Sequence, residues 1–203
     1  MSIEGGGGRT RRAGRPLSFD RQKALREAMH VFWRHGYDST SVADLTAAMG
    51  VTPPSLYAAF GNKKALFQEA VRLYVGEPLS AVRMIEESPS AREAVRALLE
   101  ASVDSFTRPD APPGCLLASA TIACRTESAD LQAELAAIRG AIETALRECL
   151  ERGMQNGELD VNTDAEATAA QVIATIQGLS TLARDGAGRD KLQRVAARVL
   201  SQF

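Results

Sequence analysis

The sequence predicts an all-α fold with a small N-terminal domain and a larger C-terminal domain. Apolar residues recur at intervals of three and four through most of the 203 residues, and no stretch of useful length alternates with the period of a β-strand. Residues that cap or stop helices divide this pattern into separate segments. We expect a flexible basic arm at residues 1–16, a first domain at 17–76 and a second at 77–203.

The composition is that of an ordinary globular protein, with 45% hydrophobic and 24% charged residues. Residues 1–80 contain 11 Lys and Arg against 7 Asp and Glu, whereas residues 81–203 contain 13 against 18. A basic first part joined to an acidic remainder suits an anionic partner at one end. No apolar run approaches the ~20 residues that span a bilayer, the N-terminus lacks an apolar signal core, and three cysteines show no disulfide spacing. We therefore expect a cytoplasmic protein without membrane contact.

The arm at residues 1–16, MSIEGGGGRTRRAGRP, has too little apolar surface to fold alone. Its arginines, above all Arg12 and Arg15, could follow phosphates or enter a narrow minor groove. A solvated basic tail is the alternative interpretation of the same composition.

A first helix is expected after Ser18, a possible N-cap, and before Gly36. Its apolar stripe should cover the following two helices, and it includes Trp33, which we predict to be a core residue.

The segment from Gly36 to Phe67 has the layout of a helix-turn-helix DNA-binding unit. Thr40 or Ser41 can cap a short helix that ends at Gly50, where the chain needs positive φ. Two residues later, Thr52 can cap a second helix. That helix begins with two prolines, which suit a first helical turn because its N–H groups have no partner within the helix.

In the second helix, Leu56 and Phe60 lie one turn apart and should pack inward. The outer face is then formed by Pro53, Pro54, Ser55, Tyr57, Ala58 and Ala59, which are the candidate groove-facing residues.

A third helix is expected after Asn62, and it begins with Lys63 and Lys64. The helix dipole disfavours cations in a first turn by up to about 1 kcal/mol. An external anion, such as a DNA phosphate, would explain their position.

The run HGYDSTSVADLTAAMGVTPPSLYAAFGNKKALF resembles the TetR (tetracycline-repressor-like) family of transcriptional regulators. The resemblance covers about the first third of the chain and implies a homodimeric repressor that binds a palindromic operator in double-stranded DNA. It implies phosphate contacts for Thr40, Ser41 and Lys63. It also implies contacts to the groove or its backbone for Thr52, Pro53, Ser55 and Tyr57. Family members often carry a bulkier or polar residue where this chain has Ala58 and Ala59, which favours methyl contacts or indirect readout here.

Helical segments continue through the second domain. Gly76 and Pro78 should break or kink the chain, and this kink is a candidate transmitter between the domains. We expect a helix that resumes at Leu79, one opened by Ser88-Pro89 and closed by the loop at residues 108–114, and a buried helix at residues 115–124. A long helix should follow from Ser128 to Gly153. A further helix should be capped by Thr163 with Glu166 and end at Asp185-Gly186, and the last should begin near Asp190.

The resemblance also implies a ligand cavity in the second domain, and composition allows a specific lining. The candidate residues are Leu99, Val103, Phe106, Cys115, Ile122, Ile138 and Gln177. Cys115 and Cys124 would lie on opposite faces of one helix and Cys149 on another helix, so no metal site is expected. No cofactor is expected either. The cysteines are more often small buried residues than sensors, but a redox- or metal-responsive regulator that uses them is an alternative.

The last two helices are rich in alanine and glycine, which allows close approach of helices. The resemblance implies that they pair with their copies in a homodimer, and that an unidentified small-molecule effector releases the operator. No Ser/His/Asp grouping, zinc spacing or Gly-rich phosphate loop is visible, so we do not expect an enzyme. A DNA-independent helical binding protein is the remaining alternative.

Overall fold

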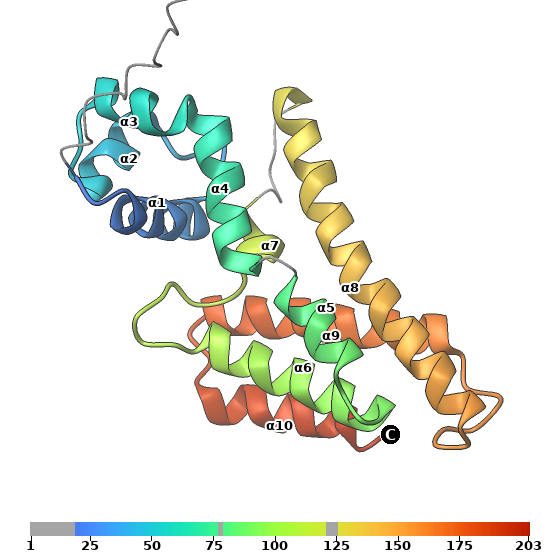
Figure 1. Cartoon of the computed structure of the whole chain (residues 1–203). Coiled ribbons are helices and arrows are strands. Elements are labelled where there is room, and N and C mark those ends of the chain that lie inside the picture. The colour runs from blue at the N-terminus through green and yellow to red at the C-terminus, as the bar shows by residue number, and fades with distance from the viewer. Residues whose placement is uncertain (1–18, 77–78, 121–125) are drawn as a thin grey trace, which may run out of the picture.

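A computed structural model describes residues 19–76, 79–120 and 126–203, and these are helical with no strand among them. The all-α prediction is therefore confirmed. The smaller domain packs α1 to α4 together, and the larger one contains the remaining helices (Figure 1). The α-helices are α1 (Arg21–His35), α2 (Val42–Met49), α3 (Pro53–Phe60), α4 (Lys63–Val75), α5 (Ser80–Glu86), α6 (Ala91–Phe106), α7 (Leu116–Ser119), α8 (Ala129–Gln155), α9 (Ala165–Arg184) and α10 (Arg189–Leu200); a 3-10 turn, η1 (Thr126–Ser128), precedes α8.

The helix starts in the N-terminal domain follow the capping residues of the sequence. Ser41, not Thr40, caps α2, and it forms a capping box with Asp44. Thr52 caps α3 and Asn62 caps α4, as predicted. For α1 the cap is Asp20, whose carboxylate accepts a hydrogen bond from the N–H of Lys23 at 3.0 Å. The predicted cap at Ser18 lies outside the described residues.

In the C-terminal domain several expected helix starts shift by one or two residues. Ser90 caps α6 in place of Ser88-Pro89. The carboxylate of Asp164 caps α9 by accepting from the N–H of Ala167 at 2.9 Å, so the expected capping box of Thr163 with Glu166 is wrong. Asp competes well for such positions because a charged oxygen meets the positive end of the helix dipole.

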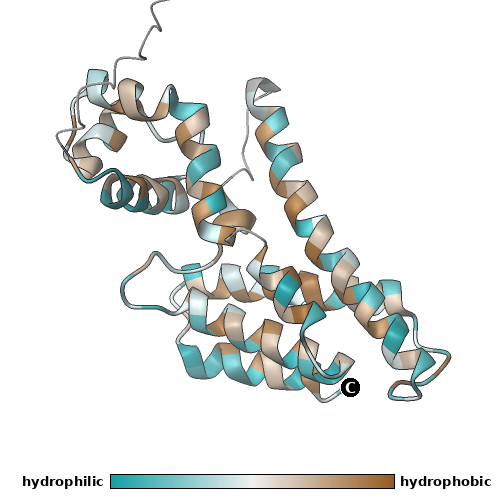
Figure 2. Ribbon diagram, in the orientation of Figure 1, coloured by the Kyte–Doolittle hydropathy of each residue, from teal (hydrophilic) through white to brown (hydrophobic). Residues whose placement is uncertain are grey.

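The buried helix expected at residues 115–124 is much shorter in the described residues. α7 covers Leu116–Ser119, and residues 121–125 lie outside the described part. Its four residues are largely hydrophobic and lie where the N-terminal domain meets the rest of the chain (Figure 2). α7 thus links the two domains.

Two hydrophobic cores hold the fold together. The first is built on α1 to α4, but it also includes Leu116, Leu117 and Ala120 around α7, and Leu131 and Leu135 at the start of α8. The second core joins α5, α6, the later half of α8, α9 and α10. The first core therefore extends beyond the domain boundary expected at residue 76. None of the described helices is long and apolar enough to cross a lipid bilayer.

Candidate nucleic-acid interface and effector cavity

α3 presents one buried face and one open face. Leu56 and Phe60 are almost fully buried in the first core. By contrast, Tyr57 is 46% exposed, an unusual position for a large aromatic side chain, and Pro53 is exposed as well. A ring held on a rigid helix with an open hydroxyl can contact a groove or a phosphate without much loss of side-chain entropy.

Hydroxyl groups lie near this face, at the start of α2 and at the start of α3. The Ser41 hydroxyl donates to the Asp44 carboxylate at 2.6 Å and accepts from the Asp44 N–H at 3.1 Å. Thr52 and Ser55 hydroxyls lie 2.9 Å apart. Ser41 and Thr52 are exposed and Ser55 is half-buried, so these predicted contact residues are accessible at helix N-termini, where anions bind favourably.

Thr40 does not share this exposure. It is 1% exposed, and its hydroxyl donates to the carbonyl oxygen of Gly36 at 2.6 Å. The side chain therefore fixes the loop between α1 and α2, and this burial does not support the phosphate contact expected of Thr40, which stays a prediction. A Thr that precedes a stronger N-cap is free to turn inward, which the sequence alone did not distinguish.

The two lysines at the start of α4 have partners within the protein. The ammonium group of Lys63 lies 4.3 Å from the ring centroid of Tyr37, a cation–π contact. Lys64 pairs with Asp130 on α8, and this pairing raises the pKa of Lys64 and lowers the pKa of Asp130. An external anion is thus not needed to explain the lysines. Lys63 is only half-buried, and its phosphate contact stays a prediction.

Arg21 on α1 contacts both α3 and α4. Its guanidinium forms an ion pair with Glu69 on α4 at 2.7 Å, donates to the carbonyl oxygen of Ala59 at 3.3 Å and lies 4.4 Å from the ring centroid of Phe60. These contacts hold the C-terminal end of α3 in place. Residue type and spacing carry no signal for this role, because it depends on a tertiary contact between α1, α3 and α4. The predicted arm residues Arg12 and Arg15 lie outside the described residues.

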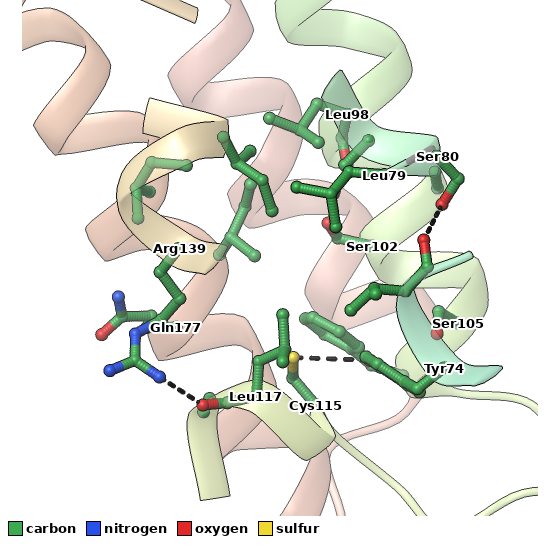
Figure 3. A pocket seen from close by; sticks show the side chains of 18 of the residues that line it. Tyr74, Leu79, Ser80, Leu98, Ser102, Ser105, Cys115, Leu117, Arg139 and Gln177 are labelled. Carbon is green, nitrogen blue, oxygen red and sulfur yellow. Dashed lines mark hydrogen bonds between the residues drawn. The ribbon is translucent and has the colours of Figure 1, made fainter. Parts of the chain in front are cut away.

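A cavity of about 220 Å³ lies between α4, α5, α6, α7, α8 and α9 (Figure 3). Its wall is mainly apolar, and polar groups occupy separate sides: Arg139 and Gln177 on one, and Tyr74 and Ser105 on the other. The apolar lining includes Val75, Leu79, Met84, Leu98, Leu117, Ile142, Ile173 and Ile176. An apolar cavity with a few separated polar groups is typical of a small-molecule site.

The predicted pocket residues divide between this cavity and the cores. Phe106, Cys115 and Gln177 line it. Leu99 and Val103 do not line it; both are buried in the second core, to which Phe106 also belongs. Ile138 instead packs against the first core, on the side of α8 that meets the N-terminal domain. Ile122 lies outside the described residues.

The cavity also contains residues that the sequence did not single out. The hydroxyl of Tyr74 donates to Sγ of Cys115 at 3.4 Å, and burial, together with the neighbouring thiol, raises the pKa of Tyr74 well above its usual value. Arg139 donates from Nη1 to the carbonyl oxygen of Leu117 at 2.6 Å. In the sequence Arg139 interrupts the apolar face of α8 between Ile138 and Ile142, but this interruption does not indicate that the residue faces a cavity.

The other cysteines lie away from the cavity. Cys149 is buried in the second core, where burial raises the pKa of its thiol, and Cys124 lies outside the described residues. In the part of the chain that the structure describes, no cluster of three His, Cys, Asp or Glu side chains could hold a metal ion.

Hydrogen bonds connect the cavity wall to the N-terminal domain through the segment at residues 114–120. The N–H of Cys115 donates to the hydroxyl of Ser180 on α9 at 2.8 Å. At the other end of α7, the carbonyl oxygen of Ala120 accepts from the N–H of Tyr37 at 2.9 Å. Displacement of α7 would therefore act on the loop that leads into α2.

Comparison with known proteins agrees with this arrangement. Residues 24–70 match the family model of bacterial regulatory proteins of the tetR family, and residues 91–199 match the tetracyclin repressor-like C-terminal domain. The chain is 34% identical over 189 residues to the HTH-type transcriptional repressor ComR of Escherichia coli K12, covering 92% of this chain and 90% of ComR. It is 30% identical to the repressor BdcR of the same organism, over 91% of this chain and 89% of BdcR.

Among solved structures, the TetR family regulator CifR, as a cysteine-substituted form in complex with 26-bp double-stranded operator DNA, is 41% identical with a TM-score of 0.86. The match covers 94% of this chain and all of that chain. These relatives are DNA-binding transcriptional regulators rather than enzymes. The chain is thus a member of the tetR family of bacterial transcriptional regulators.

Proposed function

We propose that this protein is a homodimeric repressor that binds a palindromic operator through α2 and α3 and releases it when a small molecule occupies the cavity. The observation that carries the proposal is the open face of α3, where Tyr57 is exposed between Thr52, the N-cap of α3, and Lys63, the first residue of α4. Support comes from the operator-bound form of CifR, which is similar to this chain along nearly its whole length.

The surface of α9 supports pairing of two copies. No charged residue occurs from Ala167 to Ala183, and the exposed positions there are small or neutral. A Cβ added at Gly178 would meet nothing within 4 Å, so this face is open in the single chain. A twofold pairing of such faces would place two α3 helices about 34–36 Å apart, one turn of DNA. The exposed uncharged residues are Ala167, Ala170, Gln171, Ala174, Gln177, Gly178 and Thr181.

The mechanism is linkage between two sites. A ligand that binds more tightly when the two α3 helices of the dimer are wrongly spaced for DNA lowers operator affinity. The loss equals the coupling free energy between the two sites, typically ~1–3 kcal/mol. The segment at residues 114–120 is suited to transmit it, since Cys115 lines the cavity and Ala120 contacts the loop before α2. Val75 and Leu79, on either side of the kink proposed at Gly76 and Pro78, line the same cavity, and residues 77–78 lie outside the described part.

Fluorescence anisotropy with DNA from upstream of the protein's own gene, at two salt concentrations, tests the proposal. Tyr57→Ala should weaken binding by about 1–3 kcal/mol, and Lys63→Ala should lower the salt slope by about 1. Arg83→Ala, on α5 and away from α3, is the control and should bind as the wild type does. Unchanged affinity in both reader variants would refute the assignment of α3 as the reader.

A second candidate is a regulator in which covalent modification of Cys115 replaces ligand binding. Its support is the position of the half-buried thiol in the cavity wall, within reach of the Tyr74 hydroxyl. In that case treatment with iodoacetamide, which alkylates the thiol sulfur and releases hydrogen iodide, should release DNA from the wild type but not from Cys115→Ser. Cys149→Ser is the matched control and should respond as the wild type does.

A further inference from the structure

The cavity holds a charge without a carboxylate partner. None of the ion pairs among the described residues includes Arg139, and its one hydrogen bond runs from Nη1 to the carbonyl oxygen of Leu117. A guanidinium has five N–H donors in a planar fork, so most of its donors remain available. The neighbouring arginine on α8, Arg147, pairs with Glu151 at 2.5 Å.

The surroundings of Arg139 favour an anion with an apolar body. Gln177 lies beside it and can donate through its amide, while Leu98, Ile142 and Ile173 line the apolar part (Figure 3). A charge at the edge of an apolar cavity attracts an anion strongly, because little water screens the pair. The cavity volume of about 220 Å³ lies below the range of about 300–1,000 Å³ common for drug-sized ligands, so the ligand is small.

We infer that the effector is a small amphipathic carboxylate whose carboxylate group binds the guanidinium of Arg139. This inference rests on the proposed function, because it assigns a chemical class to the ligand of the same cavity. The acid's apolar chain lies along the wall formed by Leu98, Ile142 and Ile173.

The position of Arg139 also couples this ligand to the reader domain. The carbonyl oxygen of Leu117 belongs to α7, and Arg139 is its hydrogen-bond donor from the larger domain. A ligand carboxylate attracts the whole guanidinium group through its charge and so weakens the hydrogen bond to this oxygen. Weakening that bond frees α7, whose last turn contacts Trp33 through the hydroxyl of Ser119 at 3.5 Å and Tyr37 through Ala120.

The test compares octanoate with octanamide, a neutral molecule of nearly the same shape. Binding to the full-length protein is followed by calorimetry and by the fluorescence of Trp33, the sole tryptophan, whose ring contacts that of the cavity residue Tyr74 at 4.9 Å between centroids. Octanoate should bind at least about tenfold more tightly than octanamide, the effect of a charge-assisted hydrogen bond. It should also lower operator affinity.

Arg139→Met should reduce octanoate binding to the level of octanamide. Because it also removes the hydrogen bond to Leu117, its operator affinity should lie below that of the wild type and should no longer respond to octanoate. Arg147→Met, which removes an arginine from the same helix outside the cavity, should leave the preference for octanoate intact.

Three results overturn the inference, and they differ in what they leave of the proposed function. Equal binding of octanoate and octanamide by the wild type, or unchanged octanoate affinity in Arg139→Met, refutes the carboxylate site but leaves the cavity as an effector site. Failure of both compounds to bind, in protein that still binds operator, refutes the carboxylate site and also counts against the cavity as the place where this protein is regulated. If the wild-type protein did not bind operator DNA even without either compound, the proposed function itself would be contradicted.

Discussion

The guanidinium of Arg184, in the last turn of α9, donates a hydrogen bond of 3.2 Å to the carbonyl oxygen of Trp33, near the end of α1. A second contact of 3.5 Å reaches the carbonyl oxygen of Arg34. A cation at a helix C-terminus meets the negative end of the dipole and satisfies carbonyls that have no partner within the helix. Arg184 therefore connects α9, the helix predicted to form the dimer interface, to the N-terminal domain.

Replacing Arg184 by Ala should lower the free energy of unfolding by about 1 kcal/mol, because those carbonyls lose a charged donor. Urea unfolding followed by Trp33 fluorescence measures it. Arg26→Ala, at an exposed position on α1, should change stability very little. Equal stability of both variants would show that the α9 contact adds nothing to the fold.

Gly114 lies at the tightest point of the same junction. Its φ is +83°, and a Cβ there would come within 2.8 Å of the Ser180 carbonyl oxygen and of Cγ of Arg184. Gly114→Ala should destabilise the protein by about 2–4 kcal/mol through backbone strain and steric overlap.

Gly157→Ala is the matched control for the backbone part of this loss. Gly157 has a φ of +74°, but a Cβ there meets nothing within 4 Å. It should cost only about 1 kcal/mol. A Gly114 variant no less stable than the Gly157 variant in thermal unfolding would rule out the close approach of the 114–120 segment to α9.

The capping box of α2 should make stability sensitive to acid. The hydrogen bonds from the hydroxyl and then the backbone N–H of Ser41 hold the pKa of Asp44 below its ordinary value of 3.8. The contribution of the ionised carboxylate is therefore present above that value and is lost as pH falls through the lower folded-state pKa.

Asp44→Asn should reduce the loss of stability between about pH 6 and about pH 3, measured as the shift of the urea midpoint. Glu86→Gln, at an exposed position on α5, serves as the control. If the Asp44 variant lost as much stability in acid as the wild type, the capping box would not be responsible.

The uncharged face of α9 gives a prediction about assembly. Gly178→Glu should place two unpaired carboxylates in the dimer interface and weaken dimerisation by about 100-fold or more, while glutamate favours the helix itself. Light scattering across a dilution series measures the dimer fraction. Val161→Glu, in a loop where the side chain is 77% exposed, should leave the dimer unchanged. A Gly178→Glu protein that remains dimeric would place the interface elsewhere.

The helix starts of the helix-turn-helix unit could be predicted from the sequence in detail, because N-cap geometry is local. Caps such as Ser41, Thr52 and Asn62 act within one helical turn, so residue type and spacing determine them. The burial of the Thr40 side chain was not predicted, because inward or outward rotation of one side chain depends on the loop around it.

The cavity was harder to predict because its wall combines six helices. Leu99 and Phe106 share the apolar pattern of α6, yet only Phe106 reaches the cavity. Arg139 and Tyr74 were missed because hydrophobic periodicity says nothing about which side of an amphipathic helix meets an empty space.

The first core, which takes in Leu116 and Leu117 from α7 and Leu131 and Leu135 from α8, limits how this protein can be taken apart. A chimera that joins its first 76 residues to the effector domain of another regulator would leave those four leucine positions to foreign side chains. Engineers who wish to transplant this reader onto a new sensor should carry over residues 114–120 and the start of α8, or redesign the contacting surface. The transferable unit is thus discontinuous in the chain.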